Sequence, residues 1–207
     1  KLVTFVGAGH ANGDYMATIA WDFFSGFSRS ANGAVVETGT VFSDVKTSDW
    51  FYKAVKKVSS LGLIAGRSAQ VFEPYAGIYV SEFLEIISRL GTEAGLWDGS
   101  KSSGEISAYL GLSDMSGSEK LTRAQMAHIS SAYLKAFSNF SGKVYASKSP
   151  IDFKDIGASA YKEDISWLQT AGGIKGYVEP DGSVSFKPDQ VVRRSEAAQV
   201  VMQLIES

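Results

Sequence analysis

The chain has 207 residues, of which 44% are hydrophobic and 20% are charged, and its formal net charge is −2. This length suffices for one domain or two small ones with a sizeable core, and the composition excludes a disordered, collagen-like or coiled-coil chain. The near-neutral charge, without a Lys/Arg block, argues against nucleic acid as a partner, and no apolar run is long enough to predict a membrane span. Because there is no cysteine, a disulfide scaffold, a thiolate metal site and a cysteine nucleophile are excluded, and we expect neither a metal nor a cofactor.

The first thirty residues predict a strand, a glycine-rich loop and an amphipathic helix. We expect the strand at 2–6 and the helix from Asp14, which would cap it, with apolar residues at helical spacing as far as Phe27. So short a segment cannot bury this apolar stripe by itself, so either the rest of the chain covers it or its partner precedes Lys1. Since the sequence starts without Met or a signal peptide, we expect a processed product or a piece of a longer protein.

Residues 30–40 are small and polar, contain an Asn-Gly turn signal, and predict a linker. Internal repetition organises the sequence that follows. Most motifs recur 110 or 111 residues later, and the last ones 114 later, because the loop at 177–185 is four residues longer than the loop at 67–71. The paired motifs are Phe42-Ser43-Asp44 with Phe153-Lys154-Asp155, Gly62 to Gly66 with Gly172 to Gly176, Phe72-Glu73-Pro74 with Phe186-Lys187-Pro188, and Glu82 with Glu196.

Half of this offset is about 55 residues, which predicts a middle copy. Leu121 to Met126 supplies its closing helix and Leu110-Gly111-Leu112 resembles Leu61-Gly62-Leu63, but its opening is degenerate. In each copy a first helix ends at a glycine able to take a positive φ, and a loop leads to a second helix. One helix pair cannot bury its own apolar stripes, so we predict a mainly α, pseudo-threefold bundle. The predicted boundaries are 41–92 for the first copy, 93–140 for the middle copy and 141–207 for the third copy.

These motifs closely resemble the surface-layer homology (SLH) family, which occurs as three tandem copies in bacterial surface proteins. The resemblance covers 41–207, through the Phe-x-Asp, Gly-x-x-x-Gly and Phe-x-Pro motifs and the helix starts Leu121-Thr122-Arg123-Ala124-Gln125 and Val192-Arg193-Arg194-Ser195-Glu196. It implies a secreted protein anchored non-covalently to secondary cell-wall polysaccharide. It further implies a pyruvylated N-acetylmannosamine unit bound in grooves between copies.

The resemblance also implies binding residues. Arg123 and Arg194 occupy the position of the arginine in the family's Thr-Arg-Ala-Glu motif and are expected to bind the pyruvate carboxylate, a role that Arg193 could share. Trp50 would cover an apolar sugar face or else pack in the core. The remaining candidates are Asp44 and Asp155, which would accept sugar hydroxyls or cap the first helix, and Gly66 and Gly176, which would let backbone amides approach the ligand.

Departures from the family pattern predict one or two competent grooves rather than three. Val80 stands where the first copy should have its arginine, and Arg67 is a possible substitute. The middle copy has lost the Phe-x-Asp and Phe-x-Pro motifs, so a groove that depends on them is in doubt.

Residues 1–29 resemble the C-terminal end of α/β-hydrolase esterases of the feruloyl or acetylxylan esterase and polyhydroxybutyrate depolymerase group. By that resemblance His10 would be the base of a Ser-Asp/Glu-His triad; otherwise it is a surface-loop histidine. The chain has no Gly-x-Ser-x-Gly nucleophile elbow, so we expect it not to be an enzyme as given. Three functions stay open: a wall-binding anchor, the C-terminal part of a secreted esterase with its catalytic body upstream, and a structural S-layer lattice protein.

Overall fold

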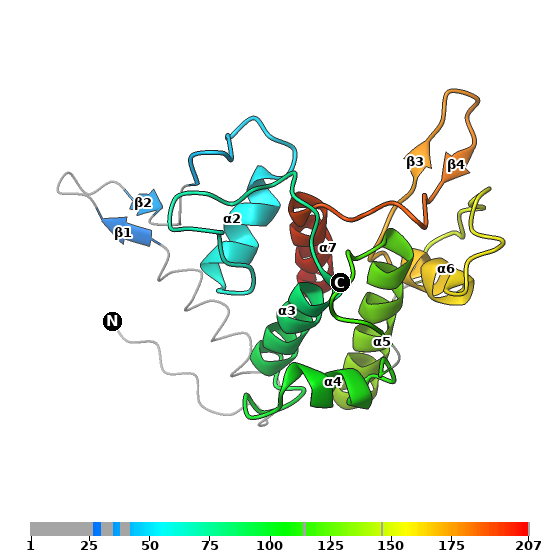
Figure 1. The fold of residues 1–207 in the computed structure, drawn as a ribbon, viewed down its shortest axis with the longest axis horizontal. Coiled ribbons are helices and arrows are strands. Elements are labelled where there is room, and N and C mark those ends of the chain that lie inside the picture. Colours follow the sequence, from blue (N-terminus) through cyan, green and yellow to red (C-terminus); the bar gives the residue numbers. More distant parts are fainter. Residues whose placement is uncertain (1–26, 30–34, 38–41, 114, 146, 207) are drawn as a thin grey trace.

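Three helix pairs make up the main body of this protein (Figure 1). The computed structural model describes residues 27–29, 35–37, 42–113, 115–145 and 147–206. The first copy contributes α2 (Tyr52–Ser60) and α3 (Val80–Glu93), the middle copy α4 (Ser103–Tyr109) and α5 (Arg123–Ser141), and the third copy α6 (Lys162–Thr170) and α7 (Arg194–Glu206). The mainly α prediction is confirmed.

Each first helix ends as its sequence predicts. Gly62, Gly111 and Gly172 follow α2, α4 and α6, with φ values of 68°, 73° and 86°. The residue after each glycine then donates its amide hydrogen to a carbonyl in the last turn of the helix, at 2.8 to 2.9 Å. The middle copy therefore has the same helix end as its neighbours, although its opening motif is missing.

A closed ring of backbone hydrogen bonds joins the three copies. The Ile78 amide donates to the Val192 carbonyl at 3.0 Å, Val192 to Leu121 at 2.8 Å, and Leu121 to Ile78 at 2.9 Å. All three side chains are fully buried. Because each residue lies just before the second helix of its copy, the ring places α3, α5 and α7 around a common pseudo-threefold axis, as the repeats predict.

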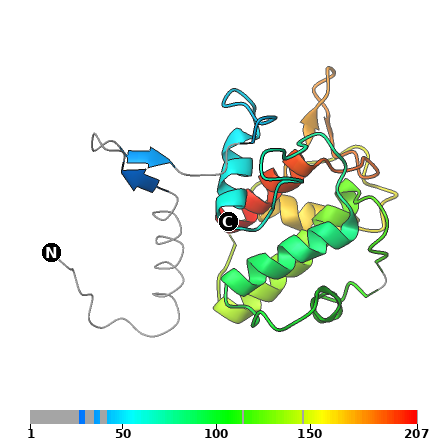
Figure 2. The same ribbon diagram turned by 60° about the vertical axis from the view of Figure 1, so that its left-hand side comes forward.

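The copies also exchange contacts cyclically around this axis. The first turn of α7 docks on the loop of the first copy, where the Ser195 amide and hydroxyl donate to the Pro74 carbonyl at 3.0 and 2.7 Å. The first turn of α5 docks in the same way on Pro188 of the third copy, and the first turn of α3 docks on residues 117–119 of the middle copy. Likewise α2 packs on α7 and α6 packs on α5, so every copy lends a surface to the next (Figure 2).

The structure adds short strands to this helical body. The longer loop of the third copy is a hairpin of β3 (Tyr177–Val178) and β4 (Val184–Ser185), which projects from the helices in Figure 1. Antiparallel strands β1 (Phe27–Arg29) and β2 (Val35–Glu37) pair Ser28 with Val36. The expected helix does not continue through Phe27, and the predicted linker contains a strand, because two consecutive valines, which favour extended backbone, supply a pairing partner. The strand predicted at 2–6, the start of the helix and His10 lie outside the described residues.

Candidate functional site

Two grooves of the described structure correspond position by position. The third-copy groove has a volume of about 510 Å³ and the first-copy groove about 180 Å³. The third-copy groove is lined by Trp50, Arg123, Met126, Ile174, Lys175, Gly176, Tyr177, Gln190, Arg193, Glu196, Gln199, Val200 and Gln203. The first-copy groove is lined by Leu63, Ile64, Ala65, Gly66, Arg67, Glu82, Glu85, Ile86, Arg89 and Arg194.

The offsets of the repeat relate these linings. Residues 174–177 correspond to 64–67 at an offset of 110, and the α7 residues of the third-copy groove correspond to the α3 residues of the first-copy groove at an offset of 114. Arg123 in the larger groove takes the place that Arg194 has in the smaller one. Each groove thus combines the loop and second helix of one copy with the arginine of a neighbour.

The two arginines hold these loops in place. Arg123 donates from Nε to the Phe186 carbonyl at 2.8 Å and from Nη2 to the Lys175 carbonyl at 3.2 Å. Arg194 donates from the same two atoms to the carbonyls of Phe72, at 2.9 Å, and Ala65, at 2.6 Å. Both side chains are buried, so they are not solvated helix ends. Because Nε and Nη2 are engaged, the two-donor fork that these two atoms form is occupied by the protein itself, although both arginines still line a groove.

The aspartates of the Phe-x-Asp motif clamp the Phe-x-Pro loop of their own copy. Asp44 accepts the amide hydrogens of Phe72 at 2.9 Å and Glu73 at 2.7 Å, and Asp155 accepts those of Phe186 and Lys187, both at 2.7 Å. The clamp fixes a strained turn, because Glu73 and Lys187 have φ values of 59° and 60°. These carboxylates neither cap the first helix nor line a groove. The capping alternative is therefore wrong, because each carboxylate holds a loop that is remote in sequence; a contact with sugar hydroxyls stays a prediction.

Gly66 and Gly176 do lie in the grooves, as expected. A Cβ atom at Gly66 would lie 2.5 Å from the Phe42 ring and 2.5 Å from the Ser68 carbonyl, and one at Gly176 would lie 2.5 Å from Phe153. Glycine is therefore required here because the phenylalanine of the Phe-x-Asp motif packs against the backbone, whether or not a ligand approaches the other side.

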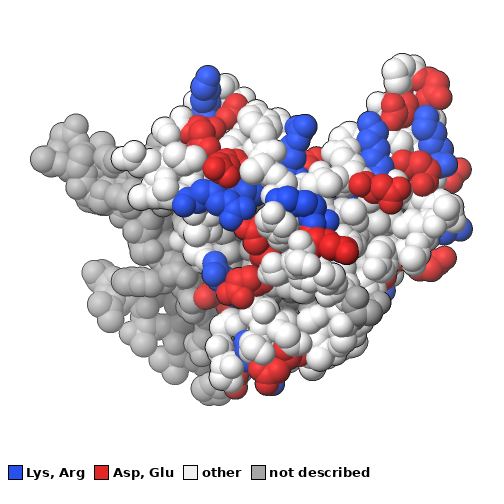
Figure 3. Space-filling view, viewed as in Figure 1, with Lys and Arg blue, Asp and Glu red and all other residues white. Residues whose placement is uncertain are grey.

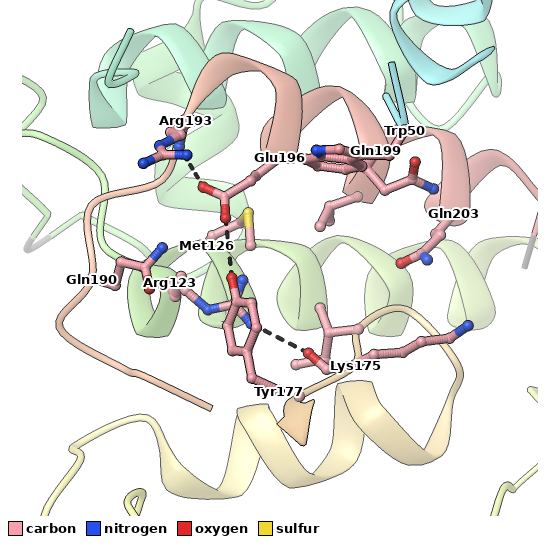
Figure 4. Close-up of a pocket in the computed structure, with 13 residues that line it drawn as sticks. Trp50, Arg123, Met126, Lys175, Tyr177, Gln190, Arg193, Glu196, Gln199 and Gln203 are labelled. Atoms are coloured by element: carbon pink, nitrogen blue, oxygen red, sulfur yellow. Dashed lines mark hydrogen bonds between the residues drawn. The ribbon is translucent and has the colours of Figure 1, made fainter. Parts of the chain in front are cut away.

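Trp50 is exposed and stands at the edge of the third-copy groove (Figure 4). Its side chain is 62% accessible, and it touches the buried Phe51 ring edge-to-face at 5.3 Å. Trp50 is therefore not a core residue, so that alternative is wrong; its contact with a sugar face stays a prediction. Trp50 comes from the first copy, whereas the rest of the groove comes from the other two.

The cations of the third-copy groove are open to solvent. Lys175 and Arg193 are both exposed, and within the described part of the chain neither has a carboxylate partner within 4.0 Å. The Arg193 guanidinium lies 5.8 Å from the Tyr75 ring. Lys175 was not singled out from the sequence; the available signal was that the residue before the last motif glycine is alanine in the first copy and lysine in the third.

Tyr177 closes the inner side of the third-copy groove. Its ring lies 4.7 Å from the Arg123 guanidinium, and its hydroxyl donates to Glu196 at 3.1 Å (Figure 4). Burial raises the pKa of Tyr177, which keeps the phenol protonated as a donor. Gln199 and Gln203 add uncharged amides on the α7 side. The repeats do not single out Tyr177, because the corresponding residue in the first copy is Arg67.

Arg67 makes the first-copy groove different. It donates to Glu82 and lies 3.7 Å from Glu73, so it does not replace the arginine missing at Val80, which belongs to another interface. Burial acts to raise the pKa of Glu82, but the hydrogen bonds from Arg67 and the Tyr79 amide outweigh it and lower that pKa. Burial, and then the nearby Arg67 charge, lower the pKa of Arg194. This groove is thus filled by a network of opposite charges.

The equivalent position beside α5 of the middle copy has different side chains. Val80 is fully buried, and its amide donates to the Glu119 carbonyl at 3.0 Å. The Tyr161 ring, the third-copy counterpart of Trp50, stacks on His128 at 4.5 Å with the planes 23° apart. Tyr161 thus covers the neighbouring α5, whereas Trp50 leaves space over α7.

Acidic and basic side chains intermingle on the face seen in Figure 3, with no wide area of one sign. This face therefore has no patch of one charge sign that would attract a ligand over a long range. Among the described residues, no group of His, Asp and Glu is arranged to hold a metal ion, and no helix is long and apolar enough to cross a bilayer.

A family model supports this account of the repeats. The model of the S-layer homology domain matches residues 41–78 and 152–198, which contain the Phe-x-Asp, Gly-x-x-x-Gly and Phe-x-Pro motifs of the first and third copies. A search of curated proteins gives no match to the sequence. The chain therefore carries S-layer homology domains at these two segments. The matched segments do not include the middle copy, so its assignment to the same family stays a prediction.

S-layer homology domains generally anchor proteins to the cell surface by binding secondary cell-wall polymer. Their presence indicates a protein associated with the cell surface or the S-layer.

Proposed function

We propose that the third-copy groove binds an acidic sugar of secondary cell-wall polysaccharide, of the pyruvylated N-acetylmannosamine type, and so anchors this protein to a bacterial cell wall. The observation that carries the proposal is the combination of one exposed indole with two exposed cations, which have no carboxylate partner among the described residues, in a hollow of about 510 Å³. That volume lies in the range of roughly 300–1,000 Å³ typical of small-molecule sites.

Each part of this sugar has a matching group. A pyruvate ketal presents a carboxylate, which Lys175 and Arg193 can bind by charge-assisted hydrogen bonds. The apolar face of the ring suits the Trp50 indole, whose amphipathic surface is half open to water. The Gln199 and Gln203 amides can donate to and accept from hydroxyl and acetamido groups. Arg123 would position the loop that carries Lys175 and present its remaining amino group to the ligand.

Purified chain should bind cell-wall sacculi before, but not after, chemical removal of pyruvate. Equal binding to stripped walls would contradict the proposed ligand. With a pyruvylated N-acetylmannosamine glycoside in calorimetry, Trp50→Ala and Lys175→Ala should each weaken binding about tenfold, the scale of one aromatic or charge-assisted contact. Lys101→Ala, which removes an exposed lysine of the middle copy, is the matched control and should bind as the parent does.

We further propose that the protein is secreted and that residues 1–29 are the end of an esterase domain, with His10 as its triad base. This rests on the sequence resemblance alone, since His10 lies outside the described residues. The 207-residue chain should not hydrolyse aryl esters, because its sequence has no nucleophile elbow. Hydrolysis that persists in a His10→Ala variant would contradict the triad role, and any hydrolysis by the chain would contradict its assignment as a binding module.

A further inference from the structure

We propose that the residue after the last motif glycine decides which groove accepts an acidic ligand, and that Arg67 is a built-in occupant that closes the first-copy groove. The inference builds on the proposed function and narrows it: this protein presents one acidic-sugar site of the two that its repeats could form.

The first-copy groove satisfies its own charges. Arg67 donates to Glu82 and also lies within ion-pair distance of Glu73. Arg89 pairs with Glu85 at 3.3 Å. Both carboxylates that line this groove are therefore neutralised by arginines that also line it. An anionic ligand would have to break one of these pairs and leave a glutamate uncompensated beside it.

The third-copy groove has an aromatic ring at the same position. Tyr177 satisfies Glu196 with a neutral hydroxyl, at 3.1 Å, instead of a guanidinium. Its ring lies 4.7 Å from the Arg123 guanidinium, whereas burial and then the nearby Arg67 charge lower the pKa of Arg194 in the first-copy groove. Among the described residues, Lys175 and Arg193 have no carboxylate within 4.0 Å, so the positive charge of this groove stays available to a ligand.

The volumes of the two grooves also favour ligand binding in the third-copy groove. The first-copy groove has about 180 Å³, against about 510 Å³ for its counterpart. The larger groove has Trp50 at its edge, contributed by the copy that follows in the cycle. The equivalent segment for the smaller groove is residues 98–102, Asp98-Gly99-Ser100-Lys101-Ser102, which contains no aromatic side chain.

The first experiment maps where a simple carboxylate binds, so that it does not depend on the sugar. Sodium pyruvate added to the parent chain should shift backbone amide resonances at 174–177 and leave those at 64–67 unchanged. In Arg67→Tyr the first-copy loop should respond as well. Equal responses of both loops in the parent, or an unresponsive first-copy loop in Arg67→Tyr, would overturn the proposal.

The reverse exchange tests the blocking role directly. Tyr177→Arg should weaken binding at the third-copy groove at least tenfold. Tyr177→Phe keeps the ring but removes the hydroxyl that donates to Glu196, so it should lose less binding than Tyr177→Arg. Adding Glu196→Gln to Tyr177→Arg should restore binding, because the new arginine then has no carboxylate to pair with. Glutamine can keep the helix start, as Gln125 does by accepting the Thr122 amide at 2.9 Å in the middle copy. If binding is not restored, steric blocking replaces the ion pair as the cause.

The proposed function and this inference can fail separately. If pyruvate responds to the exchanges as expected but the pyruvylated sugar does not bind, the groove selectivity holds and the sugar is wrong. If the sugar binds with two equivalent sites per parent chain, the anchoring function holds and the blocking role of Arg67 is wrong.

Discussion

The third-copy and first-copy grooves share their backbone contacts and differ in the side chains that face the ligand space. In both, a neighbour's arginine binds two loop carbonyls, an aspartate clamps the next loop, and a phenylalanine packs on a glycine. The differing positions include Lys175 against Ala65, Tyr177 against Arg67, Gln199 against Glu85 and Gln203 against Arg89. The residues that define the repeat motifs therefore build the site, and residues between the motif positions decide what it accepts.

The largest effect should come from the shared arginines. Arg123→Ala and Arg194→Ala should each lower the free energy of unfolding by about 3 kcal/mol, because each leaves two loop carbonyls without a donor and removes a stacked cation. If the two loops are equivalent, the two losses should agree within about 1 kcal/mol by chemical denaturation. Arg193→Ala, at an exposed neighbouring position, should change stability by less than about 0.5 kcal/mol. If Arg123→Ala unfolds at the same denaturant concentration as the parent but no longer binds ligand, Arg123 binds the ligand carboxylate and does not stabilise the loop.

A smaller effect should come from the shared glycines. Gly66→Ala and Gly176→Ala should each cost about 1–3 kcal/mol, because the new methyl would meet a phenylalanine ring and a carbonyl that cannot both move. Gly157→Ala is the control: nothing lies within 4 Å of its Cβ position, so its thermal midpoint should match the parent. Unequal losses at Gly66 and Gly176 would show that the two loops are not equivalent.

The smallest effect distinguishes two packing surfaces that are otherwise alike. Where α6 meets α5, Asp164 accepts from His128 at 2.5 Å, Ser131 at 2.9 Å and Lys135 at 2.8 Å; where α2 meets α7, the corresponding residue is the buried Ala54. Burial acts to raise the pKa of Asp164, but these hydrogen bonds outweigh it and lower that pKa.

A carboxyl whose pKa is lower in the folded state stabilises the fold above its unfolded pKa of about 3.9, and this contribution is lost as the pH falls through the folded value. We therefore expect acid unfolding below about pH 4 to be less steep in Asp164→Asn, which should also lose about 1–2 kcal/mol at neutral pH. Acid unfolding can be followed by circular dichroism. If the parent and Asp164→Asn unfold over the same pH range, Asp164 does not contribute to the pH dependence of stability.

Much of the fold could be predicted because its determinants are local or repeated. Gly62 and Gly172 end helices by their conformational freedom, and a constant offset requires that equivalent residues occupy equivalent places. The strands could not be predicted in this way. Phe27 continues a helical spacing, yet it pairs in a ladder, and the hairpin of the third copy appears in the sequence only as a longer loop.

The site was predicted in part. Trp50, Arg123, Arg193 and Gly176 do come together in one groove, although they come from three different copies. Arg194 and Gly66 line the other groove, and Asp44 and Asp155 line neither. Lys175 and Tyr177 were missed because their meaning depends on which cations and carboxylates surround them, and those partners lie in distant parts of the chain.

The sequence by itself determined that there are three helical copies, in which order they come, and where their shared glycine, aspartate and arginine positions lie. Repeated motifs and turn-forming residues are local features, so they can be recognised without the tertiary structure. Only the tertiary structure decided what those positions do. Nε and Nη2 of each arginine and the carboxylate of each aspartate satisfy backbone groups of remote loops, so these atoms are engaged before a ligand arrives. In the third-copy groove, where Glu196 accepts from the Tyr177 hydroxyl, the positive charges of Lys175 and Arg193 stay open to solvent. These exposed charges define the candidate site, and they depend on contacts between copies that are far apart in the sequence.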